Sequence, residues 1–297
     1  METILNNLYI GITLASIFLL VGLGLSFTFG QMGVINMAHG EFIMIGAYTA
    51  YVLQTTIYED AKGTAILVAL PVAFVVSGLM GVILERLLIR RMYGRALDTL
   101  LVTFGVSLLL QQAAKDIFSA NNKDVAVPTF LHGQWGLFGI TVTHTRLFIL
   151  LLVVLTMVLV WLFMTKLPAG RRMRAVMQNR ELAAVSGLPT ARVDAITFFI
   201  GSGLAGIAGV AVALIGPIGT GTGTAYIVSA FLVVIVGGLG KIQGVVIAAI
   251  ALGTLNAFVE DWTSSTLAKA AVFFFVILFL QFRPNGIVSF RTRGLTT

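Results

Sequence analysis

The sequence predicts an all-α, polytopic integral membrane protein, and three observations support this fold class. Hydrophobic residues make up 58% of the 297 residues and charged residues only 10%, whereas a soluble domain carries about 25% charged residues. The mean hydropathy is +1.00. Several uncharged stretches reach the ~20 residues that a helix needs to cross a bilayer. We therefore expect about 8–9 transmembrane or half-transmembrane helices in a single domain, residues 1–297.

The clearest spans are six apolar stretches bounded by charged residues or by Gly and Pro. They are residues 8–29, 64–86, 98–118, 146–166, 193–215 and 267–282. Three more uncharged stretches, 41–55, 225–240 and 243–260, are short or follow Gly-rich turns. We expect half-helices or re-entrant segments there. Whether 41–55 crosses the bilayer or dips back into it stays open.

The distribution of Lys and Arg predicts which helix ends face the cytoplasm. Most basic residues fall into four segments: the loop with Arg86, Arg90, Arg91 and Arg95, the loop with Lys166, Arg171, Arg172, Arg174, Arg180 and Arg192, the turn with Lys241, and the tail with Arg283, Arg291 and Arg293. Cytoplasmic segments are enriched in basic residues. We therefore place these segments in the cytoplasm, with the N-terminus outside and the C-terminus inside. No Lys or Arg precedes the first apolar run, so we expect that helix to be retained rather than cleaved as a signal peptide.

Small residues recur four positions apart in the stretch 193–215. Ser202 and Gly206, and Ala205 and Gly209, are pairs of this kind. Such pairs allow two helix backbones to approach closely inside a membrane. We expect tight helix packing there; sliding of the helices during transport is the functional alternative.

The sequence lacks the motifs of several chemistries. It has no Cys, which excludes disulfides, thiolate nucleophiles and sulfur metal sites. The Gly-rich run at residues 216–224 lacks the spacing and the terminal Lys of a P-loop, so ATP and Mg²⁺ would have to be bound by another subunit. His39 and Glu41 match no zinc pattern, and we expect neither a metal site nor a catalytic site. Despite a pI near 10.0 we expect no nucleic acid partner, because the basic residues fix the orientation in the membrane.

The segment GQMGVINMAHGE, residues 30–41, places polar side chains inside an otherwise uncharged stretch. A carboxylate at such depth costs about 2.5–3.5 kcal/mol on insertion scales, so Glu41 is expected to face protein or a water-filled path. If the helix breaks at Gly40 and restarts, Glu41 lies in the first turn, where the helix dipole favours negative charge. Two interpretations stay open. Asn36, His39 and Glu41 either cap the break or contact the substrate.

Residues 168–192 form the longest predicted cytoplasmic segment. Apolar residues recur in it near helical spacing, at Met173, Val176, Met177, Ala184, Val185 and Leu188. We expect one short amphipathic helix, ended by Gly187 and Pro189. Its small residues suit a groove on another protein better than a membrane surface, which usually selects Trp, Phe or Leu.

Three stretches show a family pattern: GQMGVINMAHGEFIMIGAY, RRMRAVMQNRELAAVSGL, and GGLGKIQGVVIAAIALG with the terminal FRPNGIV. The chain resembles, over nearly all its residues, the LivH-like permease subunits of branched-chain amino acid type ABC importers. In NMAHGEFIMIGAYTAYV and RALDTLLVTFGVSLLLQQ it is more similar to the permeases of urea importers.

The resemblance implies a multi-pass subunit of the bacterial inner membrane without covalent chemistry of its own. It implies four kinds of partner for this chain: a second related permease subunit, two ABC ATPase subunits that carry ATP and Mg²⁺, a periplasmic substrate-binding protein, and membrane lipid. It further implies that the loop 168–192 is a coupling helix that docks on the ATPases. The residues implied in this coupling are Arg180, Glu181, Ala183, Ala184 and Gly187.

Charge favours urea as the transported solute, because the spans hold almost no charge apart from Glu41 and urea is neutral. Branched-chain amino acids and short amides are the alternative, since helix ends bind carboxylates without charged side chains. A passive urea channel is the alternative from another class, but it would not need a cytoplasmic docking helix. An intramembrane protease with a Gly-x-Ser site is disfavoured, because Val75 and Ile200 stand two positions before Ser77 and Ser202.

Overall fold

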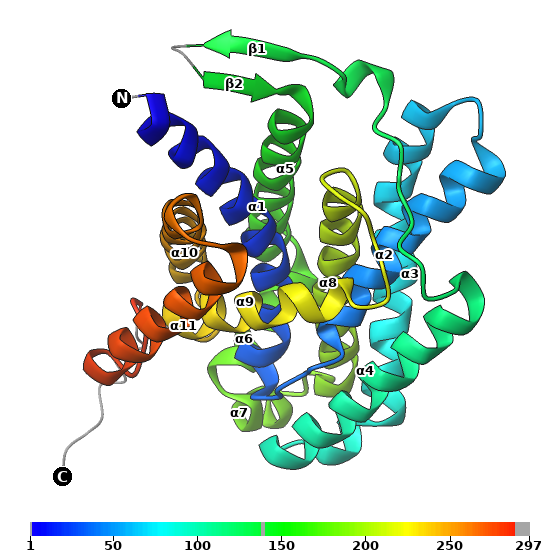
Figure 1. Cartoon of the computed structure of the whole chain (residues 1–297). Helices are drawn as coiled ribbons and strands as arrows, with labels where there is room; N and C mark the ends of the chain where they lie inside the picture. Colours follow the sequence, from blue (N-terminus) through cyan, green and yellow to red (C-terminus); the bar gives the residue numbers. More distant parts are fainter. Residues whose placement is uncertain (1, 138–139, 289–297) are drawn as a thin grey trace.

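The computed structural model describes residues 2–137 and 140–288, and long helices dominate it. Within these residues, seven helices are long and apolar enough to cross a membrane. They are α1 (Glu2–Met32), α3 (Lys62–Leu87), α4 (Ala96–Phe118), α5 (His144–Lys166), α8 (Thr190–Ala213), α10 (Ile242–Trp262) and α11 (Ser265–Phe282). Figure 1 shows them gathered into one bundle. The predicted all-α polytopic fold class is confirmed.

Two shorter helices begin inside the bundle rather than at its ends. They are α2 (His39–Val52), which a π-helical turn extends over Leu53–Ile57, and α9 (Thr222–Gly237). Their first turns meet, since a Cβ on Gly40 would lie 2.7 Å from the carbonyl oxygen of Gly223. In Figure 1, α9 crosses the front of the bundle, whereas α2 runs up beside α3.

These two helices lie in the stretches 41–55 and 225–240, where half-helices or re-entrant segments were expected. The stretch 243–260 differs from the expectation, because it forms the full-length helix α10. The glycines in this stretch suggested a turn, but they lie within the helix. Gly244 allows close contact with Gly237, and Gly253 allows close contact with Ala15.

The basic segments meet at one end of the bundle, which we call the basic end. Arg90 donates a hydrogen bond to the carbonyl oxygen of Ala191, and the backbone of Ile287 bonds to Val236. The tight turn before Lys241 packs against Gly30, at the end of α1. The predicted grouping of Arg90, Arg180, Lys241 and Arg283 on one side therefore holds, while Arg291 and Arg293 lie outside the described residues.

The opposite end holds the outer loops. Lys123 and Ile218 form a backbone bridge, Gln54 bonds to the backbone of Ala126, and Asn7 bonds to Asp261. Between α4 and α5 the chain forms a short antiparallel hairpin of β1 (Gln134–Leu137) and β2 (Ile140–Thr143). Short 3₁₀ turns lie at Ile89–Met92 and Thr129–Leu131.

The core is formed by α1, α2, α3 and α8, which pack through small residues. A Cβ on Gly46 would lie 2.6 Å from the Cα of Gly206, and one on Gly201 would lie 2.7 Å from the carbonyl oxygen of Gly24. Only Gly permits such backbone contact. The tight packing predicted from the small residues of 193–215 is confirmed.

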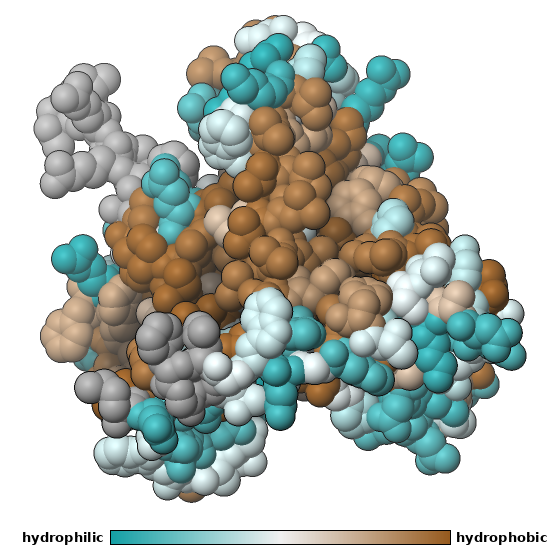
Figure 2. Space-filling view, turned by 90° about the horizontal axis from the view of Figure 1, so that it is seen from above, coloured by the Kyte–Doolittle hydropathy of each residue, from teal (hydrophilic) through white to brown (hydrophobic). Residues whose placement is uncertain are grey.

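Apolar side chains also cover much of the outside. Leu97, Leu109, Leu155 and Trp161 are each more than half exposed. Figure 2 shows a broad hydrophobic area in the middle of the view, with hydrophilic residues gathered in separate groups around it. In water such a surface would drive aggregation, whereas in a bilayer lipid tails cover it.

Candidate functional sites at the helix break and at the basic end

The chain breaks between α1 and α2, somewhat earlier than Gly40. α1 ends at Met32, Gly33 follows with a φ of +62°, and α2 begins at His39. Thr103 of α4 satisfies the backbone of the break: its Oγ1 accepts from the N–H of Met37 at 3.1 Å and lies 3.3 Å from the carbonyl oxygen of Ile35. A neighbouring helix thus provides the hydrogen bonds that were expected from Asn36 and His39.

Asn36, His39 and Glu41 are all buried at the break. Asn36 and His39 are 0% exposed and Glu41 is 1% exposed. Nε2 of His39 lies 3.3 Å from the carbonyl oxygen of Val21, but its Nδ1 and both polar side-chain atoms of Asn36 have no hydrogen-bond partner among the described residues. Nor does a side chain cap α2 at Ala38. Capping therefore does not explain these two residues.

Glu41 lies in the first turn of α2, as predicted, and joins three helices. Its Oε1 accepts hydrogen bonds from Ser107 Oγ and Gln111 Nε2 of α4, both at 2.8 Å. Gln111 Nε2 also lies 3.1 Å from Oγ1 of Thr224, in the first turn of α9. Oε2 of Glu41 is buried and has no hydrogen-bond partner in the described part of the chain. Because the N-termini of α2 and α9 both carry positive partial charge, this junction favours a carboxylate.

The Glu41 cluster borders a small cavity. The exposed Thr224 lines a space of about 260 Å³ between α1, α9, α10 and α11, together with the polar residues Ser229, Asn256 and Lys269. Sequence reasoning missed Ser107, Gln111 and Thr224. A signal was present for the first two, because polar residues four positions apart in an apolar span share one helix face.

The loop 168–192 forms two helices rather than the single helix that was expected. They are α6 (Pro168–Gln178) and α7 (Arg180–Val185). Asn179 between them is extended, with φ −156° and ψ 106°, and its side chain accepts a hydrogen bond from the N–H of Leu182 at 2.9 Å. This is an N-cap, the position where Asn is strongly favoured. The apolar positions on either side of Asn179, Met177 and Ala184, are seven residues apart, which is still helical spacing, so the pattern did not reveal the break.

The five candidate coupling residues point in two directions. Arg180 reaches back into the bundle and Ala183 is only 5% exposed. Glu181, Ala184 and Gly187 are exposed. Two large apolar side chains of α7 that were not among the candidate coupling residues are also exposed: Leu182 is 65% exposed and Val185 is 87% exposed. α7 therefore exposes an apolar patch, formed by Leu182 and Val185, next to the charged Glu181.

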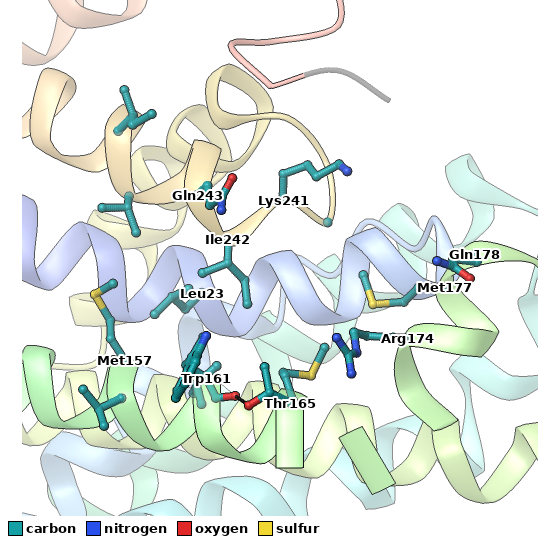
Figure 3. Close-up of a pocket in the computed structure, with 16 residues that line it drawn as sticks. Leu23, Met157, Trp161, Thr165, Arg174, Met177, Gln178, Lys241, Ile242 and Gln243 are labelled. Atoms are coloured by element: carbon teal, nitrogen blue, oxygen red, sulfur yellow. Dashed lines mark hydrogen bonds between the residues drawn. The ribbon is translucent and has the colours of Figure 1, made fainter. Parts of the chain in front are cut away.

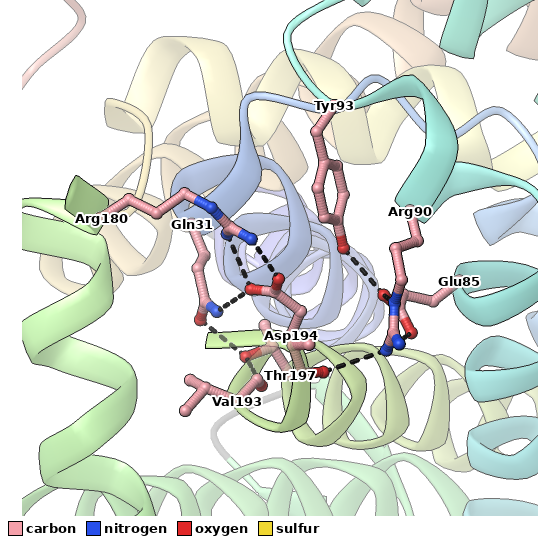
Figure 4. Close-up of polar contacts among 9 residues, drawn as sticks. Gln31, Glu85, Arg90, Tyr93, Arg180, Val193, Asp194 and Thr197 are labelled. Carbon is pink, nitrogen blue, oxygen red and sulfur yellow. Dashed lines mark hydrogen bonds and ion pairs between the residues drawn. The ribbon is translucent and has the colours of Figure 1, made fainter. Parts of the chain in front are cut away.

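Arg180 belongs to a buried polar network at the basic end, shown in Figure 4. Its guanidinium binds the carboxylate of Asp194 of α8 through both terminal nitrogens. Asp194 also accepts from Gln31 of α1 at 3.0 Å, and Gln31 in turn accepts from Thr197. The bond to Asp194 raises the pKa of the Arg180 guanidinium, so the guanidinium stays charged.

A second buried carboxylate stands beside this network. Glu85 of α3 is 0% exposed, binds Arg90, and accepts a hydrogen bond from the hydroxyl of Tyr93 at 2.9 Å. The guanidinium of Arg180 lies 4.9 Å from the centre of the Tyr93 ring. Burial, and then the charges of Asp194 and Glu85, raise the pKa of Tyr93, which stays a donor. α7 is thus tied to α1, α3 and α8.

Comparison with known proteins agrees with this architecture. The family model described as "Branched-chain amino acid transport system / permease component" matches residues 7–281. The permease protein BraD of Pseudomonas aeruginosa is 30% identical, over 96% of this chain and 95% of the relative. LivH of Escherichia coli is also 30% identical with the same coverage, and LivM of Escherichia coli is 26% identical over 93% of this chain and 68% of the relative. All three names describe high-affinity branched-chain amino acid transport system permease proteins.

No solved structure matches this chain at a significant level. The family match nevertheless spans most of the chain, including both candidate sites. The relatives are named as permease proteins, so the chain is a multi-pass transporter subunit and not an enzyme. We conclude that the protein belongs to the family of branched-chain amino acid transport system permease components.

Proposed function

We propose that this chain is the permease subunit of an ABC importer in a bacterial inner membrane, and that α7 couples it to the ATPases. The observation that supports this coupling role is the exposed apolar patch of α7, in which the side chains of Leu182 and Val185 are largely exposed at the basic end. Basic loops face the cytoplasm, where such an exposed apolar surface indicates a protein partner rather than lipid tails. A short helix with apolar anchors suits a groove on that partner.

The proposed partners follow from the same role. The similarity to both LivH and LivM supports pairing with a second, related permease. We propose that two ATPase subunits bind ATP and Mg²⁺, because this chain has no nucleotide motif of its own, and that a periplasmic binding protein delivers the solute at the opposite end. Movement of α7 would reach α8 and α1 through Arg180, Asp194 and Gln31.

We propose that the solute passes the junction of α2 and α9. Glu41, Gln111 and Thr224 connect the buried start of both half-helices with the open cavity beside α9. Binding sites of transporters commonly lie where interrupted helices begin near the middle of the membrane. Asn36 and His39 lie at the same helix break as Glu41. The amide atoms of Asn36 and Nδ1 of His39, which have no partner among the described residues, are available for new hydrogen bonds during transport.

The names of the relatives support a branched-chain amino acid as the substrate. Urea is the second candidate, favoured by the resemblance of residues 36–52 to urea importer permeases. The hydroxyl and amide groups of Ser107, Gln111 and Thr224 suit a small neutral solute as well as a zwitterion.

The substrate is tested by uptake into vesicles that contain the complete importer, with labelled leucine or labelled urea and with leucine, urea and acetamide as competitors. ATP-dependent leucine uptake that urea does not inhibit would establish the first candidate, and the reverse result the second. Flux of urea through the chain alone, without ATP, would show a passive channel and overturn the importer proposal.

The docking role of α7 is tested with Val185→Asp. Gly187 is less suitable for this test. Its φ of +82° favours glycine, so another residue at this position would strain the backbone whether or not α7 docks. We expect the Val185→Asp chain to insert normally but to lose the ATPases on purification. Ile57→Asp is the matched control, since Ile57 is 64% exposed at the opposite end. Retention of the ATPases by Val185→Asp would contradict the proposal.

A further inference from the structure

Two cavities of the bundle differ in the chemistry of their walls. The larger, of about 1060 Å³, lies between α1, α5, α6 and α10, and Figure 3 shows Leu23 and Ile242 facing Met157 and Trp161 across it. Lipid tails satisfy apolar walls of this kind. The smaller, of about 260 Å³, lies between α1, α9, α10 and α11, and we call it the α9 cavity. Polar side chains also line it, and lipid tails would leave them without hydrogen bonds, so it suits a polar ligand.

Lys269 supplies a positive charge to the α9 cavity. It lies in the second turn of α11, is exposed, and makes no hydrogen bond or ion pair within the described part of the chain. None of the residues that line this cavity, all of them described, is acidic. α11 begins at the end of the bundle opposite the basic end, where the solute would arrive. An ammonium group in this position attracts the carboxylate of a solute.

Asn256 of α10 supplies a hydrogen-bond acceptor to the same cavity. Its Nδ2 donates to Oε2 of Glu260, one turn further along α10, at 3.2 Å. Because a carboxylate accepts hydrogen bonds and does not donate them, this contact fixes which side of the amide carries the oxygen. Oδ1 of Asn256 makes no hydrogen bond to the described residues, and the negative charge of Glu260 beside the amide favours a cationic donor.

Most of the remaining wall of the α9 cavity is apolar. Phe18, Leu252 and Val272 are buried, and Val228 and Phe273 are about half exposed. An aliphatic side chain that lies on such a wall removes apolar area from water. Urea has neither an aliphatic group for this wall nor a charge for the polar groups. The walls therefore match a zwitterion with an aliphatic side chain better than they match urea.

We infer that Lys269 selects solutes that carry a carboxylate, and that the α9 cavity is a binding site at the outer part of the proposed path. The carboxylate of the solute binds the ammonium group of Lys269, and the ammonium group of the solute donates to Oδ1 of Asn256. The aliphatic side chain lies along Phe18 and Leu252. Thr224 connects this site with the Glu41 cluster. The inference rests on the proposed importer function and assigns its specificity to a residue.

A lysine that only extends towards the membrane surface is the alternative role for Lys269. Binding in the cavity distinguishes the two roles, and Val228→Cys reports on it, because the chain has no Cys of its own. In the purified complete importer, we expect leucine to slow the labelling of Val228→Cys by an uncharged maleimide. Leucinol, which lacks the carboxylate, and urea should not slow it. Equal protection by leucine and leucinol would overturn the inference, and so would the absence of protection by leucine.

The same reporter tests the charge of Lys269. Adding Lys269→Gln to Val228→Cys should raise the leucine concentration that gives half-maximal protection about tenfold or more. Lys269→Arg should retain the protection. Lys115→Gln is the matched control, because Lys115 is exposed towards the same end of the bundle but does not line the α9 cavity. An equal loss of protection in Lys269→Gln and Lys115→Gln would show unspecific charge attraction and overturn the inference.

Uptake into vesicles separates a failure of this inference from a failure of the proposed function. We expect Lys269→Gln to lower ATP-dependent leucine uptake about tenfold at low leucine concentration and Lys115→Gln to leave it unchanged. ATP-dependent uptake that Lys269→Gln does not alter would contradict the role of Lys269 and keep the importer. A parent importer without ATP-dependent uptake of leucine or urea would contradict the importer itself, and the inference with it.

Discussion

Arg180, the first residue of α7, binds Asp194 of α8 through both terminal nitrogens of its guanidinium, with Nη1 lying 2.9 Å from Oδ1. Asp194 is fully buried, so this contact connects an exposed helix directly with the core. A bidentate pair of this kind fixes direction as well as distance. The orientation of α7 is therefore set by the helices that form the proposed path.

Replacing Arg180 should uncouple transport from ATP hydrolysis. Arg180→Gln leaves the carboxylate of Asp194 buried and without its cation. Loss of one partner costs about 3–5 kcal/mol for a fully buried pair, and less here, because the side chain of Arg180 is 38% exposed. We expect a lower unfolding temperature and ATP hydrolysis that no longer drives uptake. The control is Arg172→Gln, an exposed arginine of α6; unchanged coupling in Arg180→Gln would contradict the prediction.

Tyr93→Phe should remove a stabilising contribution that depends on pH. The variant loses the hydrogen bond to Glu85 but keeps the ring beside Arg180. Because the pKa of Tyr93 is raised above its ordinary value of 10.0, folding favours the protonated hydroxyl. Its contribution is therefore fully present below about pH 10 and is lost as the pH rises above that value.

The measurement is the unfolding midpoint of both proteins between about pH 8 and 11. The parent chain should be the more stable at the lower end, and the difference should shrink towards the upper end. Tyr58→Phe is the control, since the Tyr58 hydroxyl makes no hydrogen bond within the described residues. If the difference in unfolding midpoint between the parent chain and Tyr93→Phe stays constant across this pH range, the pH-dependent contribution of the Tyr93 hydroxyl is contradicted.

Glu41→Gln should impair uptake more than it impairs folding. The amide has the same shape and can still accept from Ser107 and Gln111, but it carries no charge. A hydrogen bond to a charged group contributes about 1.5–3 kcal/mol of net free energy. Because about 1.4 kcal/mol corresponds to a factor of ten, we expect the uptake rate to fall about tenfold or more. Ser107→Ala, which removes one bond and keeps the charge, should have the smaller effect on initial uptake rates. Unchanged uptake in Glu41→Gln would reduce the cluster to a structural role.

Gly46→Val should destabilise the core without touching either site. Its Cβ would lie 2.6 Å from the Cα of Gly206, and neither backbone can move alone. Overpacking of this kind costs about 1–3 kcal/mol or more. Gly105→Val is the control, because a Cβ on Gly105 meets nothing within 4 Å. The yield of detergent-soluble monodisperse protein compares the two, and equal yields would show that α2 and α8 separate easily.

Much of the fold was predictable because hydropathy and charge are local properties of the sequence. The spans, the break near Gly40 and the place of Glu41 in a first turn all follow from residues close together in the chain. The partners of Glu41 do not, since Ser107 and Thr224 come from helices far along the sequence. Glu85 and Asp194 resemble ordinary charges at helix ends until their burial is known. In each case the missing information is a long-range contact.

The glycine contacts within the core also limit how this protein can change shape. Where backbones touch at Gly24 and Gly201, and at Gly46 and Gly206, no side chain is left to rearrange. We therefore expect α1, α2 and α8 to move together in a transport cycle, and with them the start of α9, which meets α2 through Gly223 and Gly40. Relative movement then falls to the peripheral helices α4 and α11, and a covalent cross-link between α2 and α8 should leave the cycle intact.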